Sequence, residues 1–279
     1  MKRLLVVAVA AGSLLIPAAV SARTWYVNEE GTGDAPTIEA AMDSAAYGDT
    51  VLVGPGTYQH CQLQIPDGVT LTSESGPATT TLVNATVGFG ATGYESGTLH
   101  GFTFEGTDWN EVVACYGAEG FKITGNVFVG NEHSAVICEL SEGQVRGNTM
   151  VGNGDWAIWI LSYSNVEVQG NLCVRNGVGI MASESMGVPQ CNDCWSNGVD
   201  FDGVPGTEFG NFSADPLFCD EQAGDLTLHA NSPCLLGNHP DGFDCGLIGA
   251  LGQGCNGPYT SVEEEEPTDS WTTIKALFR

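Results

Sequence analysis

Apolar residues recur through the middle of the chain at intervals of about 22 positions, so they fall into columns when the repeats are aligned. The four columns are Leu99, Ile123, Val145 and Val168; Phe104, Phe128, Met150, Cys173 and Cys194; Val113, Val136, Ile158 and Ile180; and Cys115, Cys138, Ile160 and Ala182. Several inward columns in one repeat predict several short strands per turn, with side chains that alternate in and out. Each repeat is too short to bury its own apolar face, so the repeats must stack into a solenoid.

Two asparagines, five positions apart, mark each repeat. The first series is Asn126, Asn148, Asn171 and Asn192, and the second is Asn131, Asn153, Asn176 and Asn197. Asparagine tolerates the left-handed backbone of a sharp corner, and its amide can both donate and accept hydrogen bonds between neighbouring turns. The pattern therefore predicts two structural asparagine ladders at corners of the solenoid, rather than catalytic or ligand-binding groups.

Residues 34–47 follow a different period. Ile38, Ala41, Met42 and Ala45 have the spacing of one face of a helix. The first turn of a solenoid exposes apolar core and unpaired strand edges, which a helix laid across that end would cover. We therefore predict an amino-terminal capping α-helix on an otherwise all-β chain.

The two ends of the chain differ in composition from the repeats. Residues 1–22 combine Lys2 and Arg3 with an apolar run and a small-residue exit, the layout of a cleaved signal peptide. The alternative, a transmembrane anchor, would need a longer apolar run without proline. We expect residues 23–256 to form one domain that is secreted to the extracellular or periplasmic space, with no transmembrane segment after cleavage. Residues 257–279 form an acidic linker and a short tail, for which a surface-attachment signal and a disordered end both stay open.

Several motifs carry a resemblance to a known fold family. They are residues 37–45, 48–58 and 69–77, the Gly-Asn repeats, and the closing segments 215–219, 232–234 and 245–250. The chain resembles exported bacterial members of the pectin-lyase-like superfamily. That resemblance implies an all-β right-handed parallel β-helix solenoid, and it specifies the fold rather than an activity.

The net charge of the chain limits the kinds of binding partner that it can have. The formal net charge is −26, which excludes nucleic acid and anionic lipid surfaces by Coulomb repulsion. Polyanionic sugars would need a bridging calcium ion. Asp193, Asp200 and Asp202 are candidate oxygen ligands for calcium, although their spacing matches no complete calcium loop. No other cofactor is predicted.

The ten cysteines fit an oxidising compartment. Cysteines that share a column one turn apart would have α-carbons about 4.8 Å apart, within the range that a disulfide accepts. We therefore predict the disulfides Cys115–Cys138 and Cys173–Cys194, with Cys219–Cys234 and Cys245–Cys255 as local closures of the last turns. Cys61 and Cys191 are left without partners.

One outward ridge combines acids with aromatic and imidazole groups. Candidate catalytic acids occupy similar places on three successive turns, each followed by a candidate substrate-binding residue: Asp108 and Trp109, Glu132 and His133, Asp155 and Trp156. Carboxylates one turn apart approach the ~5 Å separation of retaining glycosidases, and aromatic faces can stack on sugar rings. A merely solvated acidic ridge is the alternative on so acidic a chain.

The chain lacks the catalytic patterns of the superfamily it resembles. Its lyases use a Lys or Arg base beside calcium and its hydrolases use clustered aspartates, whereas Lys122, Arg146 and Arg175 fall at different register positions here. We therefore expect a non-catalytic exported protein that presents a rigid surface to polysaccharide or to a cell-surface component. The alternative is a carbohydrate-active enzyme, either a glycosidase or a calcium-assisted polysaccharide lyase. A third hypothesis borrows from β-helix proteins that help mature periplasmic copper sites, but the shortage of His and Met clusters argues against it.

Overall fold

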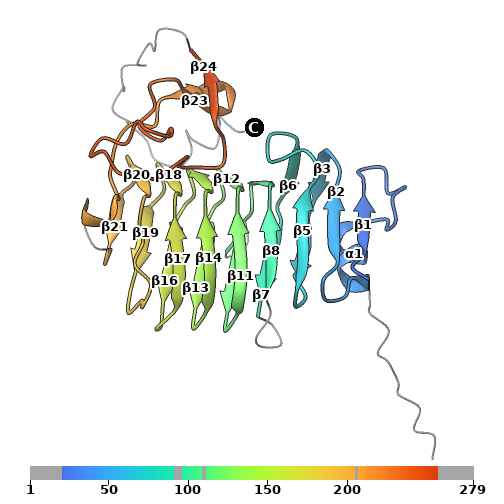
Figure 1. The fold of residues 1–279 in the computed structure, drawn as a ribbon. Coiled ribbons are helices and arrows are strands. Elements are labelled where there is room, and N and C mark those ends of the chain that lie inside the picture. Colours follow the sequence, from blue (N-terminus) through green and yellow to red (C-terminus); the bar gives the residue numbers. More distant parts are fainter. Residues whose placement is uncertain (1–20, 91–95, 109–110, 205–206, 257–279) are drawn as a thin grey trace, which may run out of the picture.

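The chain winds into a parallel β-solenoid whose turns contribute strands to three sheets. The computed structural model describes residues 21–90, 96–108, 111–204 and 207–256. Each of the three main sheets has seven strands. The strands stack side by side along one axis, from β1 at one end to β21 at the other (Figure 1). The all-β fold predicted from the sequence is confirmed.

Each sheet takes one strand from almost every turn. We name the sheets A, B and C. Sheet A consists of β1 (Thr24–Val27), β2 (Thr50–Val53), β5 (Val69–Ser73), β8 (Gly97–His100), β11 (Glu119–Thr124), β14 (Glu142–Arg146) and β17 (Asn165–Gln169). Sheet B consists of β3 (Gly56–Gln59), β6 (Thr80–Val83), β9 (Thr103–Glu105), β12 (Val127–Val129), β15 (Thr149–Val151), β18 (Leu172–Val174) and β20 (Asp193–Trp195). Sheet C consists of β4 (Gln62–Gln64), β7 (Thr86–Phe89), β10 (Val113–Tyr116), β13 (Val136–Glu139), β16 (Trp156–Leu161), β19 (Val178–Ala182) and β21 (Val199–Asp202).

The four apolar columns form the core in the predicted register. Ile123 pairs with Leu99 and Val145 in sheet A, and Phe128 pairs with Phe104 and Met150 in sheet B. In sheet C, the Val136 and Cys138 columns continue in register into β16 and β19. Almost all members of the columns are fully buried, because side chains that alternate along short strands send every second residue inward.

Both asparagine series form buried ladders between successive turns. Asn148, for example, donates from Nδ2 to Oδ1 of Asn171 at 3.0 Å and to the carbonyl oxygen of Ile123 at 2.9 Å. The first ladder continues beyond the predicted repeats, since Nδ2 of Asn192 donates to Oδ1 of Asn211 at 3.0 Å. Each amide thereby satisfies backbone groups at a corner that would otherwise be buried without partners.

The sequence predicts that each asparagine itself takes the left-handed backbone of the corner. In the structure, the residue before the asparagine takes it. Before the first series, Gly147 has φ of 59°, Gly170 has φ of 65° and Cys191 has φ of 55°; before the second series, Gly152 has φ of 66° and Arg175 has φ of 52°. The left-handed residue turns the chain, and the asparagine that follows then directs its amide along the solenoid axis. The prediction assigned both tasks to one residue.

A short helix, α1 (Ile38–Ser44), lies at the amino-terminal end of the solenoid (Figure 1). Thr37 caps it, because its Oγ1 accepts from the amide of Ala40 at 3.2 Å. Ile38, Ala41 and Met42 join the buried core, and the helix packs against β1, β2 and β4. This is the place expected of a cap, and the capping role itself stays a prediction.

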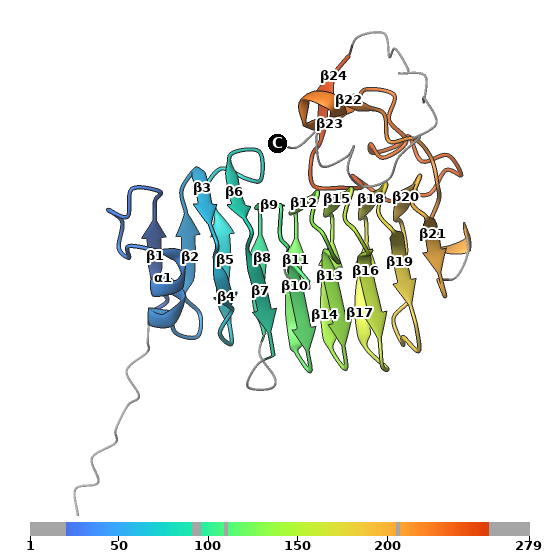
Figure 2. The same ribbon diagram turned by 180° about the vertical axis from the view of Figure 1, so that it is seen from behind.

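The chain after β21 forms a compact lobe against the outer face of sheet B. After the 3₁₀ turn η1 (Thr207–Phe209), the lobe contains β22 (Phe218–Asp220), the 3₁₀ turn η2 (Glu221–Ala223), β23 (Asp225–His229) and β24 (Gln253–Cys255). From behind, the lobe is seen beside β12, β15, β18 and β20 and away from the first turns (Figure 2). Its apolar side chains pack with those of sheet B in a second core, which includes Val151, Leu172, Leu228 and Ile248.

Candidate functional site

The outer face of sheet C carries an apolar column. Ala114, Ile137, Trp159 and Met181 are in register on β10, β13, β16 and β19, and they alternate with the inward Val136 and Cys138 columns. Among the described elements, the lobe lies over sheet B and no element packs over this face (Figures 1 and 2). Trp159 and Met181 are therefore partly exposed.

Trp159 stacks on a second indole. The rings of Trp156 and Trp159 have centroids 4.3 Å apart and planes inclined by 21°. Their Nε1 atoms are enclosed, and neither has a hydrogen-bond partner in the described parts of the chain. The pair is therefore held by stacking and packing, in contrast to most buried indoles, which anchor their N–H group.

Part of the predicted ridge lies next to this pair. Asp155 directly precedes Trp156, and its Oδ2 lies 3.0 Å from Nδ1 of His133 on the preceding turn. Both side chains are 45% exposed. The backbone amide of Glu132, in the same corner, donates to the carbonyl oxygen of Thr107 at 2.9 Å. The structure thus brings His133, Asp155 and Trp156 together.

The rest of the ridge is less closely joined. Asp108 is exposed one turn earlier, and Trp109 lies outside the described residues. The structure places no described contact between Asp108 and the His133–Asp155 pair. A pair of catalytic carboxylates across the cleft of a glycosidase therefore stays a prediction.

A shallow groove adjoins the apolar column towards the amino-terminal end. Its volume is about 410 Å³, and its lining includes Gln64, Gly88, Glu111 and Ala114. A Cβ atom at position 88 would lie 2.3 Å from Oε1 of Gln64, so the Gln64 side chain occupies the space that the glycine leaves. Small residues at successive outward positions lower the sheet surface beside the indoles. The face therefore offers both a stacking platform and polar groups along one direction.

The electrostatics of sheet C disfavour an anionic ligand. Four described residues are Lys or Arg, and none lies on this face: Lys122 and Arg146 are on sheet A, Arg23 pairs with Asp34, and Arg175 pairs with Glu221. Glu111, Glu139 and Asp155 do lie on it or at its rim. An apolar platform with carboxylates and amides beside it suits a polyhydroxylated chain, whose C–H faces stack and whose hydroxyls donate.

Sequence reasoning identified Trp156 but missed Trp159. The signal was available, because strict alternation from the inward Ile158 and Ile160 places Trp159 outward. An exposed tryptophan on a regular strand is informative, since the repeat itself does not require it.

The three acids proposed for calcium do not come together. Asp193 is fully buried beneath the lobe, where its carboxylate accepts from the amide of Ala214 at 3.1 Å and from Sγ of Cys234 at 3.1 Å. Asp200 ends the second ladder by accepting from Nδ2 of Asn197 at 3.0 Å, and it also accepts from Ser213. In the described ranges, no group of three or more His, Cys, Asp or Glu side chains is placed to hold a metal ion.

Burial sets the acid–base properties of the Asp193 contact. Loss of hydration raises the pKa of Asp193 to about 7, against the lowering effect of its bonds to Cys234 and Ala214. Burial, together with the neighbouring carboxylate, also raises the pKa of the Cys234 thiol. Asp193 therefore belongs to the junction between solenoid and lobe rather than to a solvent-facing site.

The predicted disulfide pairings are wrong. The bonds are Cys191–Cys245 and Cys219–Cys255, and Cys115, Cys138, Cys173, Cys194 and Cys234 are buried thiols, as is Cys61. Cys219 and Cys255 meet because β22 and β24 flank β23, and Cys234 turns instead to Asp193. The column partners are in register as expected, but their side chains project together into the core, where Cys173 packs on Sδ of Met150 at 3.9 Å.

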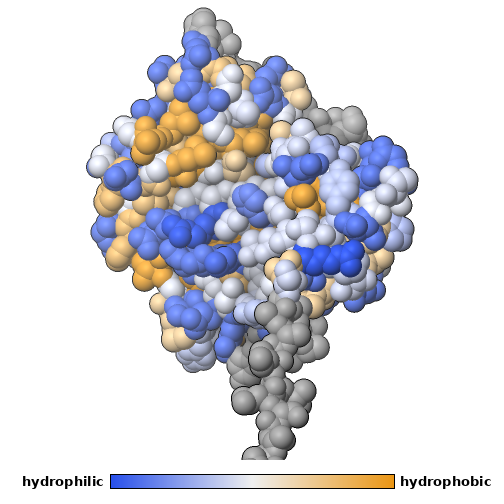
Figure 3. Space-filling model, turned by 45° about the vertical axis from the view of Figure 1, so that its right-hand side comes forward, coloured by the Kyte–Doolittle hydropathy of each residue, from blue (hydrophilic) through white to orange (hydrophobic). Residues whose placement is uncertain are grey.

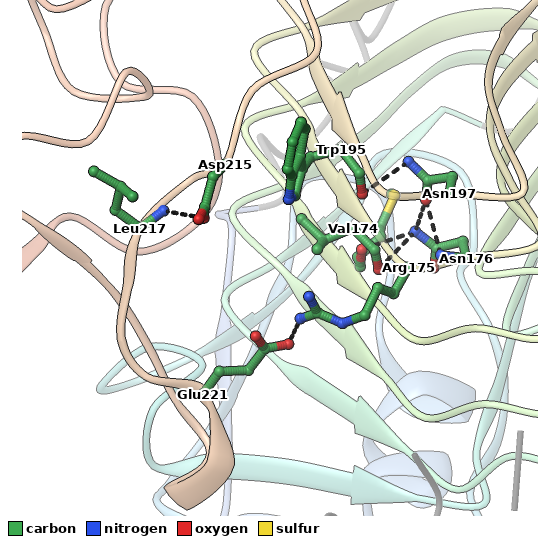
Figure 4. Close-up of polar contacts among 9 residues, drawn as sticks. Val174, Arg175, Asn176, Trp195, Asn197, Asp215, Leu217 and Glu221 are labelled. Atoms are coloured by element: carbon green, nitrogen blue, oxygen red, sulfur yellow. Dashed lines mark hydrogen bonds and ion pairs between the residues drawn. The ribbon is translucent and has the colours of Figure 1, made fainter. Parts of the chain in front are cut away.

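Arg175 joins the solenoid corner to the lobe. It takes the left-handed position before Asn176 and forms an ion pair with Glu221 at the start of η2. Figure 4 shows this pair beside the ladder bond from Asn176 to Asn197. The side chain that replaces a corner glycine thus anchors the lobe.

Comparison with protein-family models and with solved structures gives a match in each case. A family model described as "Periplasmic copper-binding protein (NosD)" matches residues 46–199, more than half of the chain. The chain belongs to this family. A search of curated proteins finds no match. Among solved structures, a mutant of the PL6 family alginate lyase AlyGC is similar at 15% identity and a TM-score of 0.45. That similarity covers 57% of this chain and 28% of the lyase.

The periplasmic description of the family is consistent with the predicted export. The predicted leader and tail lie outside the described residues. Within those residues, none of the helices has the length and apolar character needed to cross a membrane.

The family is described as copper-binding, which requires donor groups that suit copper and that the metal can reach. Soft sulfur ligands suit Cu(I), and the nearest candidates are Met150, Cys173 and Cys194 in one inward column. All three are fully enclosed in the core, and burial raises the pKa of Cys194 well above its usual range. Metal binding needs deprotonated ligands and an entry path. These residues therefore do not fit a copper site.

Proposed function

We propose that this exported member of the NosD family binds an uncharged polysaccharide on the outer face of sheet C, without cleaving it. The observation that carries the proposal is the stacked, partly exposed pair of Trp156 and Trp159 on a sheet face that no described element covers. The pair lies beside the polar contact of His133 and Asp155. The groove at Gly88 and Ala114 continues the face along the solenoid axis.

The geometry of a solenoid suits an extended polymer. Successive strands are about 4.8 Å apart, so side chains in one outward column present contacts at a regular interval along the axis. A sugar chain along that column would stack on the indoles, and its hydroxyls would reach Asp155, Glu139 or Gln64. Binding energy would then come from stacking, which contributes about 0.5–1.5 kcal/mol per aromatic contact beyond burial.

Binding without turnover is the preferred form of the proposal. A general acid or base must reach the scissile bond while a second group supports the reaction. Asp155 is engaged by His133, and no Lys or Arg from the described part of the chain stands on this face. A carbohydrate-active enzyme that uses Asp108, Glu132 or Asp155 is the competing outcome of the experiment below.

The mature protein would be incubated with linear neutral and acidic polysaccharides, with and without calcium. Retardation in affinity electrophoresis reports binding, and reducing-end and unsaturated-product assays report cleavage. We expect retardation by a neutral polymer, lost in Trp159→Ala and kept in the control Tyr163→Ala, which removes a 65% exposed aromatic side chain from a turn outside the face. Cleavage that Asp155→Asn or Glu132→Gln abolishes would overturn the non-catalytic proposal.

We also propose that residues 268–279 attach the protein to the cell surface. The support is compositional: an acidic run at residues 263–266 precedes an apolar segment at the end of the chain. Deleting residues 268–279 should release the protein from the surface fraction, and an unchanged distribution between cells and medium would contradict this proposal.

A further inference from the structure

Sheet A carries a groove of its own on a different outer face of the solenoid. Its volume is about 480 Å³, within the usual range for small-molecule sites. The lining comes from β11, β14 and β17 and from residues 186–190, so the groove crosses successive turns along the solenoid axis. Gly143 lines the groove. A Cβ atom at this position would lie 2.5 Å from the ring of Phe121, so a larger residue would not fit there without a shift.

One wall of this groove is polar and ordered. Lys122, Gln144 and Glu167 occupy the same outward register position on three successive turns. Nε2 of Gln144 donates to Oε2 of Glu167 at 2.8 Å, and Oε1 of Glu167 lies 3.5 Å from Arg146. The bond to Glu167 fixes the Gln144 side chain at the edge of the groove. Lys122 is exposed and forms no ion pair with any described residue.

One end of the groove, formed by the segment beside β17, is apolar and firmly attached. Met186 and Val188 are 64% and 40% exposed. Their segment is held to β17 by backbone bonds from Met186 to Ser164 at 2.9 Å and from Gln190 to Val168 at 3.0 Å. The exposed apolar side chains are therefore fixed by the backbone rather than by burial of their own surface.

The polar row and the apolar end of the groove together define the ligand. We propose that this groove is a second glycan-binding site for an uncharged sugar chain, so that one molecule binds two chains and cross-links them. A sugar ring has C–H faces for Met186 and Val188 and hydroxyl groups for Lys122 and Gln144. Glu142 and Glu167 also line the groove, and they outweigh Lys122 against an acidic sugar chain.

This inference rests on the proposed function only for cross-linking, because the groove itself stands on different residues. Two sites on separate faces convert binding of one chain into bridging, since each molecule can engage two polymers at once. The solenoid core lies between sheets A and C, so the two chains would be held apart at a fixed distance.

The experiment separates the two sites. Isothermal titration would use linear gluco-, manno- and xylo-configured hexasaccharides and a hexauronate as probes. The proteins would be the wild type, Trp159→Ala, Gln144→Leu and the double variant, with Thr98→Val as a control in the same outward column but outside the groove. We expect two sites per molecule in the wild type, one in Trp159→Ala, and one unchanged site beside one weakened site in Gln144→Leu. Gln144→Leu should weaken its own site about tenfold, the value of one directed hydrogen bond.

Each of the other outcomes would overturn one part of the proposal. If Trp159→Ala removes all binding, the groove on sheet A is overturned and the sheet C site stands. If Gln144→Leu removes all binding while Trp159→Ala changes nothing, the sheet C site is overturned and the groove stands. Preference for the hexauronate would overturn the proposed ligand class. Wild type should also gel a long neutral polysaccharide, and gelling by either single variant would contradict cross-linking.

Discussion

Sheets B and C both turn apolar side chains outward, but they differ in what lies over them. On sheet B, Val151, Leu172 and Val174 are almost fully buried beneath the lobe. On sheet C, Trp159 and Met181 stay partly exposed. The described residues therefore cover one apolar face with a lobe, and on the other face they bury Ile137 but leave Trp159 and Met181 partly exposed. The difference supports the proposal that the sheet C face binds a ligand, because exposed apolar patches on protein surfaces often mark interaction sites.

The face of the molecule drawn in Figure 3 carries apolar patches among hydrophilic ones. The cover of sheet B also has a specific attachment: the Cys191–Cys245 bond, the Arg175–Glu221 ion pair and the buried Asp193–Cys234 contact. No such attachment is seen on sheet C in the ranges that the structure describes.

The largest expected effect comes from releasing the lobe. Replacing Cys191 and Cys245 by alanine removes the disulfide that joins the lobe to the solenoid. The two cysteines are 54 residues apart in sequence. The chain-entropy estimate for a loop of this length is about 4 kcal/mol. We expect amides of β15 and β18 to lose that much protection in hydrogen exchange. The matched control, Cys219→Ala with Cys255→Ala, removes a bond within the lobe and should leave sheet B protected. Equal loss in both variants would mean that the disulfide does not hold the cover.

A somewhat smaller loss of stability, which affects both faces, is expected from a break in the asparagine ladder. Asn171→Ala removes an acceptor for Asn148 and donors to Val145 and Asn192, and it leaves their buried partners unsatisfied. We expect a loss of about 3 kcal/mol in the free energy of unfolding, measured in urea. The exposed Asn165→Ala on the neighbouring β17 should cost less than about 0.5 kcal/mol. Similar values for the two would show that the ladder contributes little.

The attachment of the lobe should also depend on pH. The folded pKa of Asp193 is raised by burial to about 7, above the unfolded value near 3.9. The unfolded state therefore loses its proton first as pH rises, and stability falls between about pH 4 and 7. The slope approaches 1.4 kcal/mol per pH unit, or about 2 kcal/mol from pH 5 to 6.5. Asp193→Asn should flatten this slope in hydrogen exchange of β20. A slope that is unchanged in the variant would exclude Asp193 as its origin.

The sequence revealed the solenoid because each core position recurs. Leu99, Ile123 and Val145 repeat one physical task, so periodicity alone identifies it. The lobe contains unique contacts, and nothing in the repeat predicts that Cys245 returns to Cys191 or that Asp193 meets Cys234. The corner was half predicted: the ladder follows from the asparagines, but the left-handed residue before them was missed.

The candidate site shows the same limit. Asp155 and His133 could be aligned from the repeat and do meet. The groove on sheet A could not be foreseen, because Lys122 and Met186 come from different turns and their separation depends on how residues 186–190 attach to β17. Residues that break a repeat are placed by tertiary contacts rather than by the period.

The most direct test of the open face is oxidative footprinting with and without a bound neutral polysaccharide. Hydroxyl radicals modify exposed aromatic side chains, so the rates at Trp156, Trp159 and Tyr163 can be followed in one experiment. We predict that the ligand protects both tryptophans at least about threefold, while Tyr163, on its exposed turn, reacts as before. Binding with unchanged oxidation of Trp156 and Trp159 would contradict the claim that sheet C is the glycan-binding face.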